Sequence, residues 1–232
     1  MTEATATRLV TRLEEISGGY DALLCDLWGC FHNGVAPYPA AVAALQRFRA
    51  GGGAVVMLTN APRPHGAVQT HLDAMSAPRD AYDAIVSSGD ATRAEIESGR
   101  HGCAFHIVGP ARDAPIWRGL DIDHAPLERA EAILCTGLYD DAVETPDDYM
   151  DLVQDGVARG LPFLCANPDV IVDRGDQRLY CAGAIAERYA GLGGRVLFFG
   201  KPHPPIYALA LGVARGLRPG LATERVLALG DG

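Results

Sequence analysis

A short apolar run that ends abruptly in an aspartate is the feature that most constrains the fold of this chain. The run covers residues 22–25, Asp26 follows it directly, and a glycine-containing loop continues to Gly34. Such a run is typical of a buried strand in a parallel sheet. Because open α/β sheets bind ligands at the carboxyl ends of their strands, Asp26 is a candidate for chemistry. The alternative is an aspartate that simply ends a strand and begins a turn.

The same arrangement recurs along the chain. Three more apolar runs end in polar residues: 54–58 before Thr59 and Asn60, 195–199 before Lys201, and 225–229 before Asp231. A strand, a helix and a strand at this spacing form a βαβ unit. In one parallel sheet with right-handed crossovers, all four strand ends point to the same edge. The predicted helices cover residues 3–16, 38–50, 64–75, 91–97, 182–189 and 206–215.

The middle of the chain is less regular and predicts a second, smaller α/β domain inserted into the first. Between Gly102 and Tyr180, apolar strands at 104–108, 132–135 and 162–165 are separated by acidic or proline-containing segments. The predicted fold class is therefore α/β, with a doubly wound parallel sheet and an inserted smaller α/β domain.

Charge and composition exclude several classes of partner. The formal net charge is −9 and the sequence pI is about 5.2, so no overall positive field attracts nucleic acid or anionic lipid. Any phosphate site must therefore be local. No run approaches the about 18 apolar residues of a membrane span, and the N-terminus has no apolar leader, which favours a cytoplasmic protein. Six scattered cysteines without a CxxC pair predict buried reduced thiols.

The residues at the four strand ends suit phosphoryl chemistry. The carboxylates of Asp26 and Asp231 can hold Mg²⁺, which prefers hard oxygen ligands. Thr59 and Asn60 can donate hydrogen bonds to phosphate oxygens, and Lys201 can neutralise charge that develops in the transition state. A remaining oxygen of Asp26 can attack phosphorus and form an aspartyl-phosphate. Each signal is weak alone, since such residues commonly form turns or solvated surface, but their order and spacing favour the chemical interpretation.

These motifs resemble the haloacid dehalogenase (HAD) superfamily, specifically subclass IIA, the NagD-like phosphatases. The matching motifs are Asp26-Leu27-Trp28-Gly29 (nucleophile), Leu58-Thr59-Asn60 (phosphate binding), Gly200-Lys201-Pro202 (lysine) and Gly230-Asp231-Gly232 (metal). Ala166-Asn167-Pro168-Asp169, followed by Gly183-Ala184, resembles a stretch near the end of the NagD-like cap.

The resemblance implies both an architecture and a reaction. The Rossmann-like HAD core would comprise residues 1–100 and 181–232, and residues 101–180 would form the cap that closes on substrate. The reaction would be magnesium-dependent hydrolysis of a small phosphate monoester through an aspartyl-phosphate. Asp26, the backbone carbonyl of Trp28 and Asp231 would hold the metal.

Two positions depart from the family's pattern. Its phosphatases carry a second aspartate two residues after the nucleophile, as general acid and base, and Trp28 occupies that position here. Indole cannot carry that proton, and such help is worth about 10² to 10⁴ in rate. The family's acidic motif also continues to another aspartate, so we expect the natural protein to extend beyond Gly232 and Mg²⁺ binding without that partner to be weaker. His32, in the loop after Asp26, is a candidate replacement for the missing acid.

Two alternative functions stay open at this stage. One is a catalytically impaired protein that binds a phosphate ligand without turning it over. The other is a carbon–halogen or carbon–phosphorus hydrolase, whose relatives also lack an acid at the position of Trp28. The expected partner in the main interpretation is a small phosphorylated molecule, without nucleic acid or membrane. The sequence leaves the oligomeric state open and is compatible with a homo-oligomer.

Overall fold

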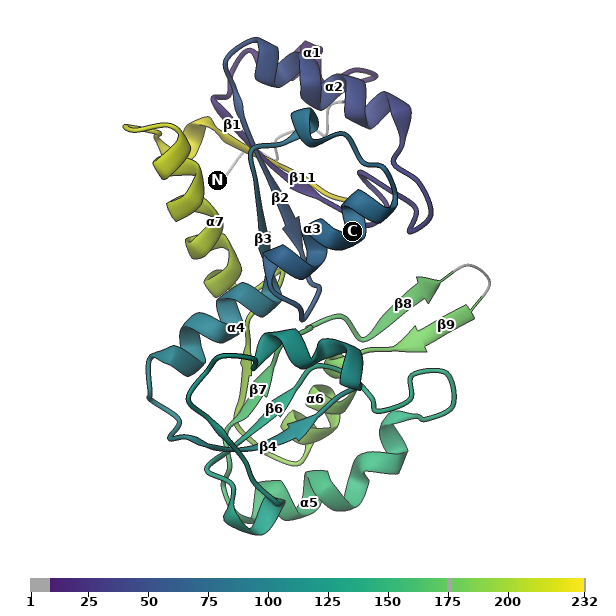
Figure 1. Ribbon diagram of the computed structural model, residues 1–232, viewed down its shortest axis with the longest axis vertical. Helices are drawn as coiled ribbons and strands as arrows, with labels where there is room; N and C mark the ends of the chain where they lie inside the picture. The colour runs from purple at the N-terminus through teal and green to yellow at the C-terminus, as the bar shows by residue number, and fades with distance from the viewer. Residues whose placement is uncertain (1–8, 175–176, 232) are drawn as a thin grey trace, which may run out of the picture.

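Two parallel sheets organise the molecule, a computed structural model that describes residues 9–174 and 177–231. Each sheet forms the centre of one lobe, and the two lobes lie one above the other in Figure 1. The predicted α/β class with parallel sheets is confirmed. The first sheet has the order β11-β1-β2-β3, with β1 at Ala22–Asp26, β2 at Ala54–Thr59, β3 at Ala84–Ser87 and β11 at Val226–Leu229.

Helices cover both faces of the first sheet, as a doubly wound fold requires. Along β1 and β2, alternate side chains point to opposite faces, so Leu23 and Met57 pack on one side and Leu24 and Val56 on the other. The first of these faces carries α2 (Pro39–Ala50) and α3 (His65–Ala74), with α1 (Glu14–Ser17) packed against α2, and the second carries α7 (Pro204–Leu217).

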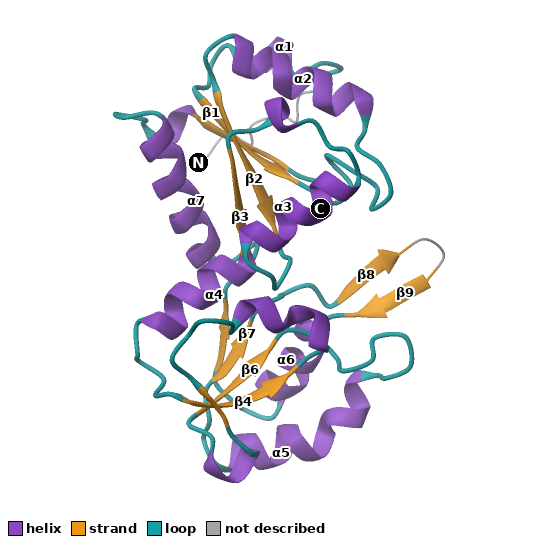
Figure 2. Cartoon of the chain, in the orientation of Figure 1, coloured by secondary structure: helices purple, strands orange, loops and turns teal. Residues whose placement is uncertain are grey.

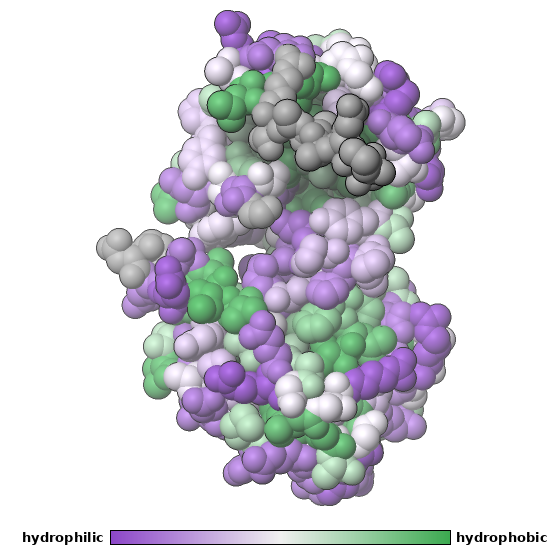
Figure 3. All heavy atoms as spheres, turned by 180° about the vertical axis from the view of Figure 1, so that it is seen from behind, coloured by the Kyte–Doolittle hydropathy of each residue, from purple (hydrophilic) through white to green (hydrophobic). Residues whose placement is uncertain are grey.

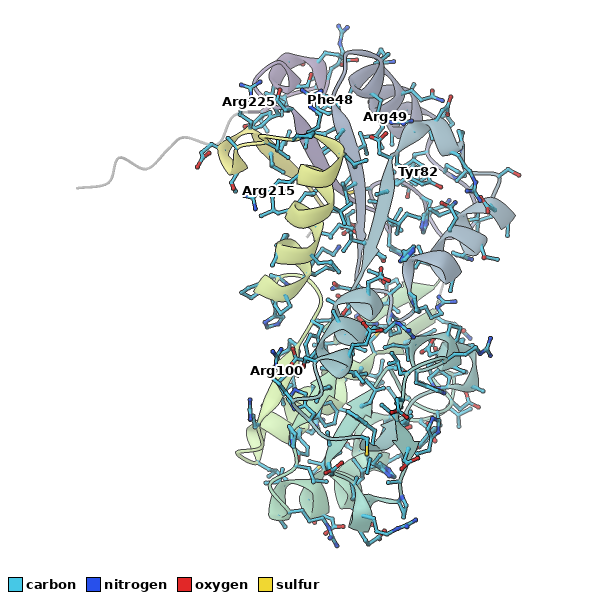
Figure 4. All side chains as sticks on the ribbon, turned by 60° about the vertical axis from the view of Figure 1, so that its left-hand side comes forward. Phe48, Arg49, Tyr82, Arg100, Arg215 and Arg225 are labelled. Carbon is cyan, nitrogen blue, oxygen red and sulfur yellow. The ribbon has the colours of Figure 1, made fainter. Side chains whose placement is uncertain are left out.

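Polar contacts fix α2 to the sheet. Arg49 at the end of α2 donates to the Asp83 carboxylate at 2.5 Å, and the other oxygen of Asp83 accepts from the backbone N–H of Val55 at 2.8 Å. Arg49 and Tyr82 lie on the same side of the first lobe in Figure 4. The register of β2 and the position of α2 are thus fixed together.

The second sheet contains the strands that were predicted between residues 104 and 165, together with two that were not expected there, at Asp123–His124 and Val196–Phe198. Its order is β10-β7-β6-β4-β5, with β4 at Ala104–Val108, β5 at Asp123–His124, β6 at Ala132–Cys135, β7 at Phe163–Cys165 and β10 at Val196–Phe198. One face packs against α4 (Ser88–Glu97), and the other against α5 (Met150–Ala158) and α6 (Ala182–Gly191).

The position of β10 corrects the predicted division of the chain. Residues 181–232 were assigned to the first sheet, but β10 pairs with β7, and α6 packs on the second sheet. The four predicted strand ends therefore do not belong to one sheet. A short apolar run predicts a buried strand, but it does not indicate which neighbouring strand it pairs with or which sheet it joins.

Other elements differ from the predictions or were not predicted. The hairpin of β8 (Ile171–Arg174) and β9 (Gln177–Tyr180) projects from the second lobe in Figure 2, and neither it nor α5 was predicted. Of the helix predicted over residues 3–16, residues 3–8 lie outside the described part, and the helix observed beyond them is only α1. Short 3₁₀ helices cover Arg79–Ala81, Ala111–Ile116, Leu127–Arg129, Pro146–Tyr149 and Thr223–Arg225.

Two further predictions concern the cysteines and the membrane. Four of the six free cysteines are buried, but Cys30 is half-buried and Cys103 is exposed, so the prediction of buried thiols was wrong for these two. Within the described residues, none of the helices combines the length and apolar character needed to cross a bilayer.

Candidate active site

A cavity of about 470 Å³ lies between the two sheets, and both contribute the carboxyl ends of their strands to it. The first sheet contributes the segments after β1, β2 and β11, and the second contributes those after β4, β6, β7 and β10. Seen from behind, the molecule narrows and is hollowed between the lobes, beside the hairpin (Figure 3). The principle that α/β sheets bind ligands at carboxyl ends thus applies to both sheets at once.

Asp26 and Lys201 form an ion pair in this cavity. The ammonium of Lys201 contacts Oδ2 of Asp26, and both side chains are largely shielded, with 21% and 14% of their surfaces exposed. Oδ1 of Asp26 accepts a hydrogen bond of 2.7 Å from the backbone N–H of Leu27. Lys201 follows a strand of the second sheet, so the pair joins the two lobes. It is also the only lysine among the 232 residues.

Thr59 and Asn60 lie at the end of β2, and both line the cavity. Oγ1 of Thr59 accepts from the N–H of Ala61 at 3.2 Å, which leaves the hydroxyl hydrogen available to a ligand. Asn60 differs, because its Nδ2 already donates to the carbonyl oxygen of Lys201 at 3.1 Å and to Oδ1 of Asp169 at 2.8 Å. Both amide hydrogens of Asn60 are therefore engaged within the protein.

Asp231 lies against the loop that follows Asp26. Gly29 has φ +81°, and a Cβ built there would lie 1.8 Å from Oδ2 of Asp231, so only glycine leaves room for this carboxylate. Asp26 and Asp231 both line the cavity. Two carboxylates, a backbone carbonyl and water form a hard-oxygen donor set that fits Mg²⁺. Within the described ranges, no cluster of three or more His, Cys, Asp or Glu side chains exists to form a denser metal site.

Trp28 forms part of the cavity wall beside the nucleophile candidate. Its ring packs over Gly34, where an added Cβ would lie 2.4 Å from Cη2, and it meets His32 edge to face with centroids 5.5 Å apart. About a third of the side chain is exposed. The indole is thus held in place by its own loop and presents an apolar surface to a ligand.

His32 does not line the cavity. Only 3% of the residue is exposed, and its Nδ1 accepts a hydrogen bond of 3.0 Å from the N–H of Gly34. Burial, with a smaller effect of nearby His71, lowers the pKa of His32 to about 4. A neutral imidazole with one nitrogen occupied favours the structural role over the predicted role as replacement acid.

Three charged residues that were not among the predicted site residues, Arg63, Asp113 and Asp169, also line the cavity. Asp113 is 4% exposed and faces Arg63 at 3.6 Å across the lobes, and burial raises the pKa of its carboxyl. Burial also raises the pKa of Asp169, which the hydrogen bond from Asn60 partly opposes. Asp169 comes shortly after the apolar run of β7, much as Asp26 comes directly after the apolar run of β1, so a search for acidic residues near strand ends could have identified it.

Comparisons with known proteins agree with this architecture. A family model described as haloacid dehalogenase-like hydrolase matches residues 23–123. A haloacid dehalogenase-like family hydrolase from Brucella suis 1330 is 45% identical in sequence, with a TM-score of 0.91, and the match covers 97% of this chain and 82% of that one. No curated protein matches the chain.

Two more distant structures share the fold. A 4-nitrophenylphosphatase from Thermotoga maritima is 18% identical, with a TM-score of 0.71, over 93% of this chain and 80% of that one. A glycerol phosphate phosphatase from Mycobacterium tuberculosis, in complex with calcium, is 21% identical, with a TM-score of 0.68, over 93% and 61% of the two chains. At these identities the likeness establishes the fold alone.

Proposed function

Because this chain belongs to the haloacid dehalogenase-like hydrolase family, as its motifs predicted, we propose that it hydrolyses small phosphate monoesters with Asp26 as nucleophile. The observation that carries this proposal is the Asp26–Lys201 pair at the carboxyl ends of strands from both sheets, in a cavity large enough for a small molecule. The two phosphatases that share the fold support the choice of a phosphate ester.

The groups around Asp26 suit attack on phosphorus. One carboxylate oxygen forms a bond to phosphorus while the ester P–O bond breaks, which leaves an aspartyl-phosphate and an alkoxide or phenolate. An alkoxide takes its proton from water, because Trp28 has none to give. Water then cleaves the phosphorus bond to Asp26 and releases inorganic phosphate. Lys201 neutralises charge on the transferring group, and the free hydroxyl hydrogen of Thr59 donates to a phosphate oxygen.

Mg²⁺ is the proposed cofactor. Asp26, the backbone carbonyl of Trp28 and Asp231 would hold it, because they supply hard oxygens from adjacent loops. The ion would neutralise negative charge of the bound phosphate group. The calcium in the related glycerol phosphate phosphatase supports a divalent cation in this fold.

The role of Asn60 is revised by the hydrogen bonds of its side chain. The sequence suggested that its amide donates to phosphate, but both amide hydrogens are already engaged. We therefore assign phosphate contact to Thr59 and Lys201, and a supporting role to Asn60.

One alternative retains a specific observation in its favour. Trp28 cannot exchange a proton, and His32, the replacement considered above, is buried away from the cavity. A protein that binds a phosphate ligand but turns it over very slowly would have this constellation.

Phosphate release tests the proposal. A panel of sugar, nucleotide and aryl phosphates is incubated with wild-type protein and Asp26→Asn, with and without Mg²⁺. We expect Mg²⁺-dependent release that Asp26→Asn abolishes while its melting temperature stays close to that of the wild type. Release that is equal in the two proteins would contradict the assignment of Asp26. If neither protein releases phosphate while wild type binds the esters in calorimetry, the binding-protein alternative holds.

A further inference from the structure

We propose that Asp169 is a positioning residue that holds the catalytic lysine in place through Asn60. The inference rests on the proposed function, since it concerns the lysine of that site. It adds a residue that contacts neither Asp26 nor Lys201 through a hydrogen bond, yet determines how the two meet.

The hydrogen bonds of Asn60 carry the first step. Its Oδ1 accepts from the backbone N–H of Lys201 at 2.6 Å, and its Nδ2 donates to the carbonyl oxygen of the same residue at 3.1 Å. The side-chain amide of Asn60 therefore forms hydrogen bonds with both the N–H and the carbonyl oxygen of Lys201. The third bond, from Nδ2 to Oδ1 of Asp169 at 2.8 Å, is the one that reaches another segment.

Asp169 determines the orientation of that amide. A carboxylate only accepts hydrogen bonds, so the amino end of Asn60 must face Asp169 and the carbonyl end must face the N–H of Lys201. Asn60 is 8% exposed, and a flipped amide would set its oxygen against the Asp169 carboxylate, so that two acceptors face each other and the hydrogen bond is lost. Asp169 thus excludes the orientation that would release the Lys201 backbone.

Close packing fixes the segment that carries Asp169. A Cβ at Gly200 would lie 2.4 Å from Oδ1 of Asn60 and 2.5 Å from Cδ of Pro168. A Cβ at Gly183 would lie 2.2 Å from the carbonyl oxygen of Pro168. The segment 167–169 is therefore confined between two glycines, and Asp169 has little freedom to move away from Asn60.

The arrangement links the two lobes at the reacting group. Asn60 follows β2 of the first sheet, whereas Asp169 and Lys201 follow β7 and β10, which are neighbours in the second sheet. The ammonium of Lys201, from the second lobe, contacts Asp26 of the first lobe. The hydrogen bonds of Asn60 to the Lys201 backbone fix the position of Lys201 relative to the first lobe. Loss of Asp169 should therefore affect turnover more than substrate binding.

Kinetics of four variants test the positioning role. We expect Asp169→Ala to lower kcat about 5- to 100-fold with little change in KM, because a buried amide hydrogen loses its acceptor and the Lys201 backbone is freed. Asp169→Asn, whose new amide oxygen can still accept from Asn60, should recover most of kcat. Asn60→Ala already removes the amide that links Asp169 to Lys201. Adding Asp169→Ala to this variant should therefore lower kcat little further.

A surface carboxylate provides the matched control. Asp147 pairs with Arg188 at 3.1 Å and its side chain is 75% exposed, so Asp147→Ala removes an aspartate carboxylate and its contact without touching the site. Its kcat should equal that of the wild type. If Asp169→Ala does not fold, Asp169→Leu, of similar size, replaces it. Additive losses in the Asn60/Asp169 double variant, or no recovery with Asp169→Asn, would overturn the proposal.

A second measurement does not depend on turnover. Lys201 is the only lysine among residues 1–232, and labelling is measured on the isolated peptide that contains it, so an amine-reactive reagent reports there on one ε-ammonium. We expect several-fold faster labelling in Asp169→Ala than in wild type, Asp169→Asn and Asp147→Ala. Unchanged labelling in Asp169→Ala would overturn the positioning role. A wild-type protein that releases no phosphate would refute the proposed hydrolysis, while the labelling comparison would still decide this inference.

Discussion

At the scale of single residues, Trp28 has the largest consequence for chemistry. Its indole stands on the cavity wall two residues after the proposed nucleophile and can neither give nor take a proton. An alkoxide leaving group needs a proton, whereas a nitrophenolate departs without one. The wild-type protein should therefore favour aryl over alkyl phosphates.

Substitution of Trp28 tests this preference. Trp28→Asp should raise turnover of alkyl phosphates, by up to about 10² to 10⁴, which is the usual worth of general acid–base help. Aryl phosphates should gain much less. Trp28→Asn is the control, because asparagine opens the same space as aspartate but has no carboxyl to carry a proton. Equal alkyl phosphate turnover in the two variants would show that the proton comes from elsewhere.

His32 makes a separate prediction about stability. Its pKa is lowered to about 4 in the folded protein, against an ordinary value of 6.5. The unfolded chain therefore binds more protons between these values, and the free energy of unfolding should fall as the pH drops from 6.5 to 4. The effect is on the order of 2 to 3 kcal/mol for this nearly buried ring. In urea titrations, His32→Asn should flatten the dependence, since its amide oxygen can still accept from Gly34; an unchanged slope would assign the titration to other groups.

At the scale of elements, α6 shows how one glycine position joins a helix to the site. Gly183, at the start of α6, faces the carbonyl oxygens of Pro168 and Asp169, whereas Gly191 at its end has open space around a built Cβ. Gly183→Ala should lower the free energy of unfolding by about 1 to 3 kcal/mol, through overpacking against backbone. Gly191→Ala should raise it by up to about 1 kcal/mol, because alanine favours the helix. Denaturant unfolding measures the free energy of unfolding of both variants. Equal changes in Gly183→Ala and Gly191→Ala would mean that the segment 167–169 shifts easily to make room for the added methyl group.

The elements also show what the sequence could and could not predict. β1 and β2 were identifiable because apolar runs ended by Asp26 and Thr59 carry a clear strand signal. The sheet that contains β10 was not, because pairing with β7 depends on contacts between residues far apart in the chain. The same limit applies to Asn60: its motif marked it for the site, but its role follows from hydrogen bonds to Lys201 and Asp169, more than a hundred positions away.

At the scale of the whole molecule, charge opposes the proposed ligand. The net charge is −9, yet the substrate is an anion, so attraction must come from the few cations in the cavity, among them Arg63 and Lys201. Arg63 comes from the first lobe and faces Asp113 of the second at 3.6 Å. This pair sets part of the local potential, and each member can be neutralised separately.

Neutralising Arg63 and Asp113 should therefore shift KM in opposite directions. Arg63→Gln should raise KM for a phosphate monoester, and Asp113→Asn should lower it, each by about two- to fivefold at low salt. Because neither side chain is assigned to bond making, kcat should change little. Added salt should shrink the effect of Arg63→Gln more than that of Asp113→Asn, since screening acts on the partly exposed Arg63 and much less on the buried Asp113. Steady-state kinetics at two ionic strengths provide the measurement. A KM of the double variant close to that of the wild type would show that the two charges act through the electrostatic potential of the cavity and offset each other. Shifts of the same sign would mean instead that the pair acts by holding the lobes together.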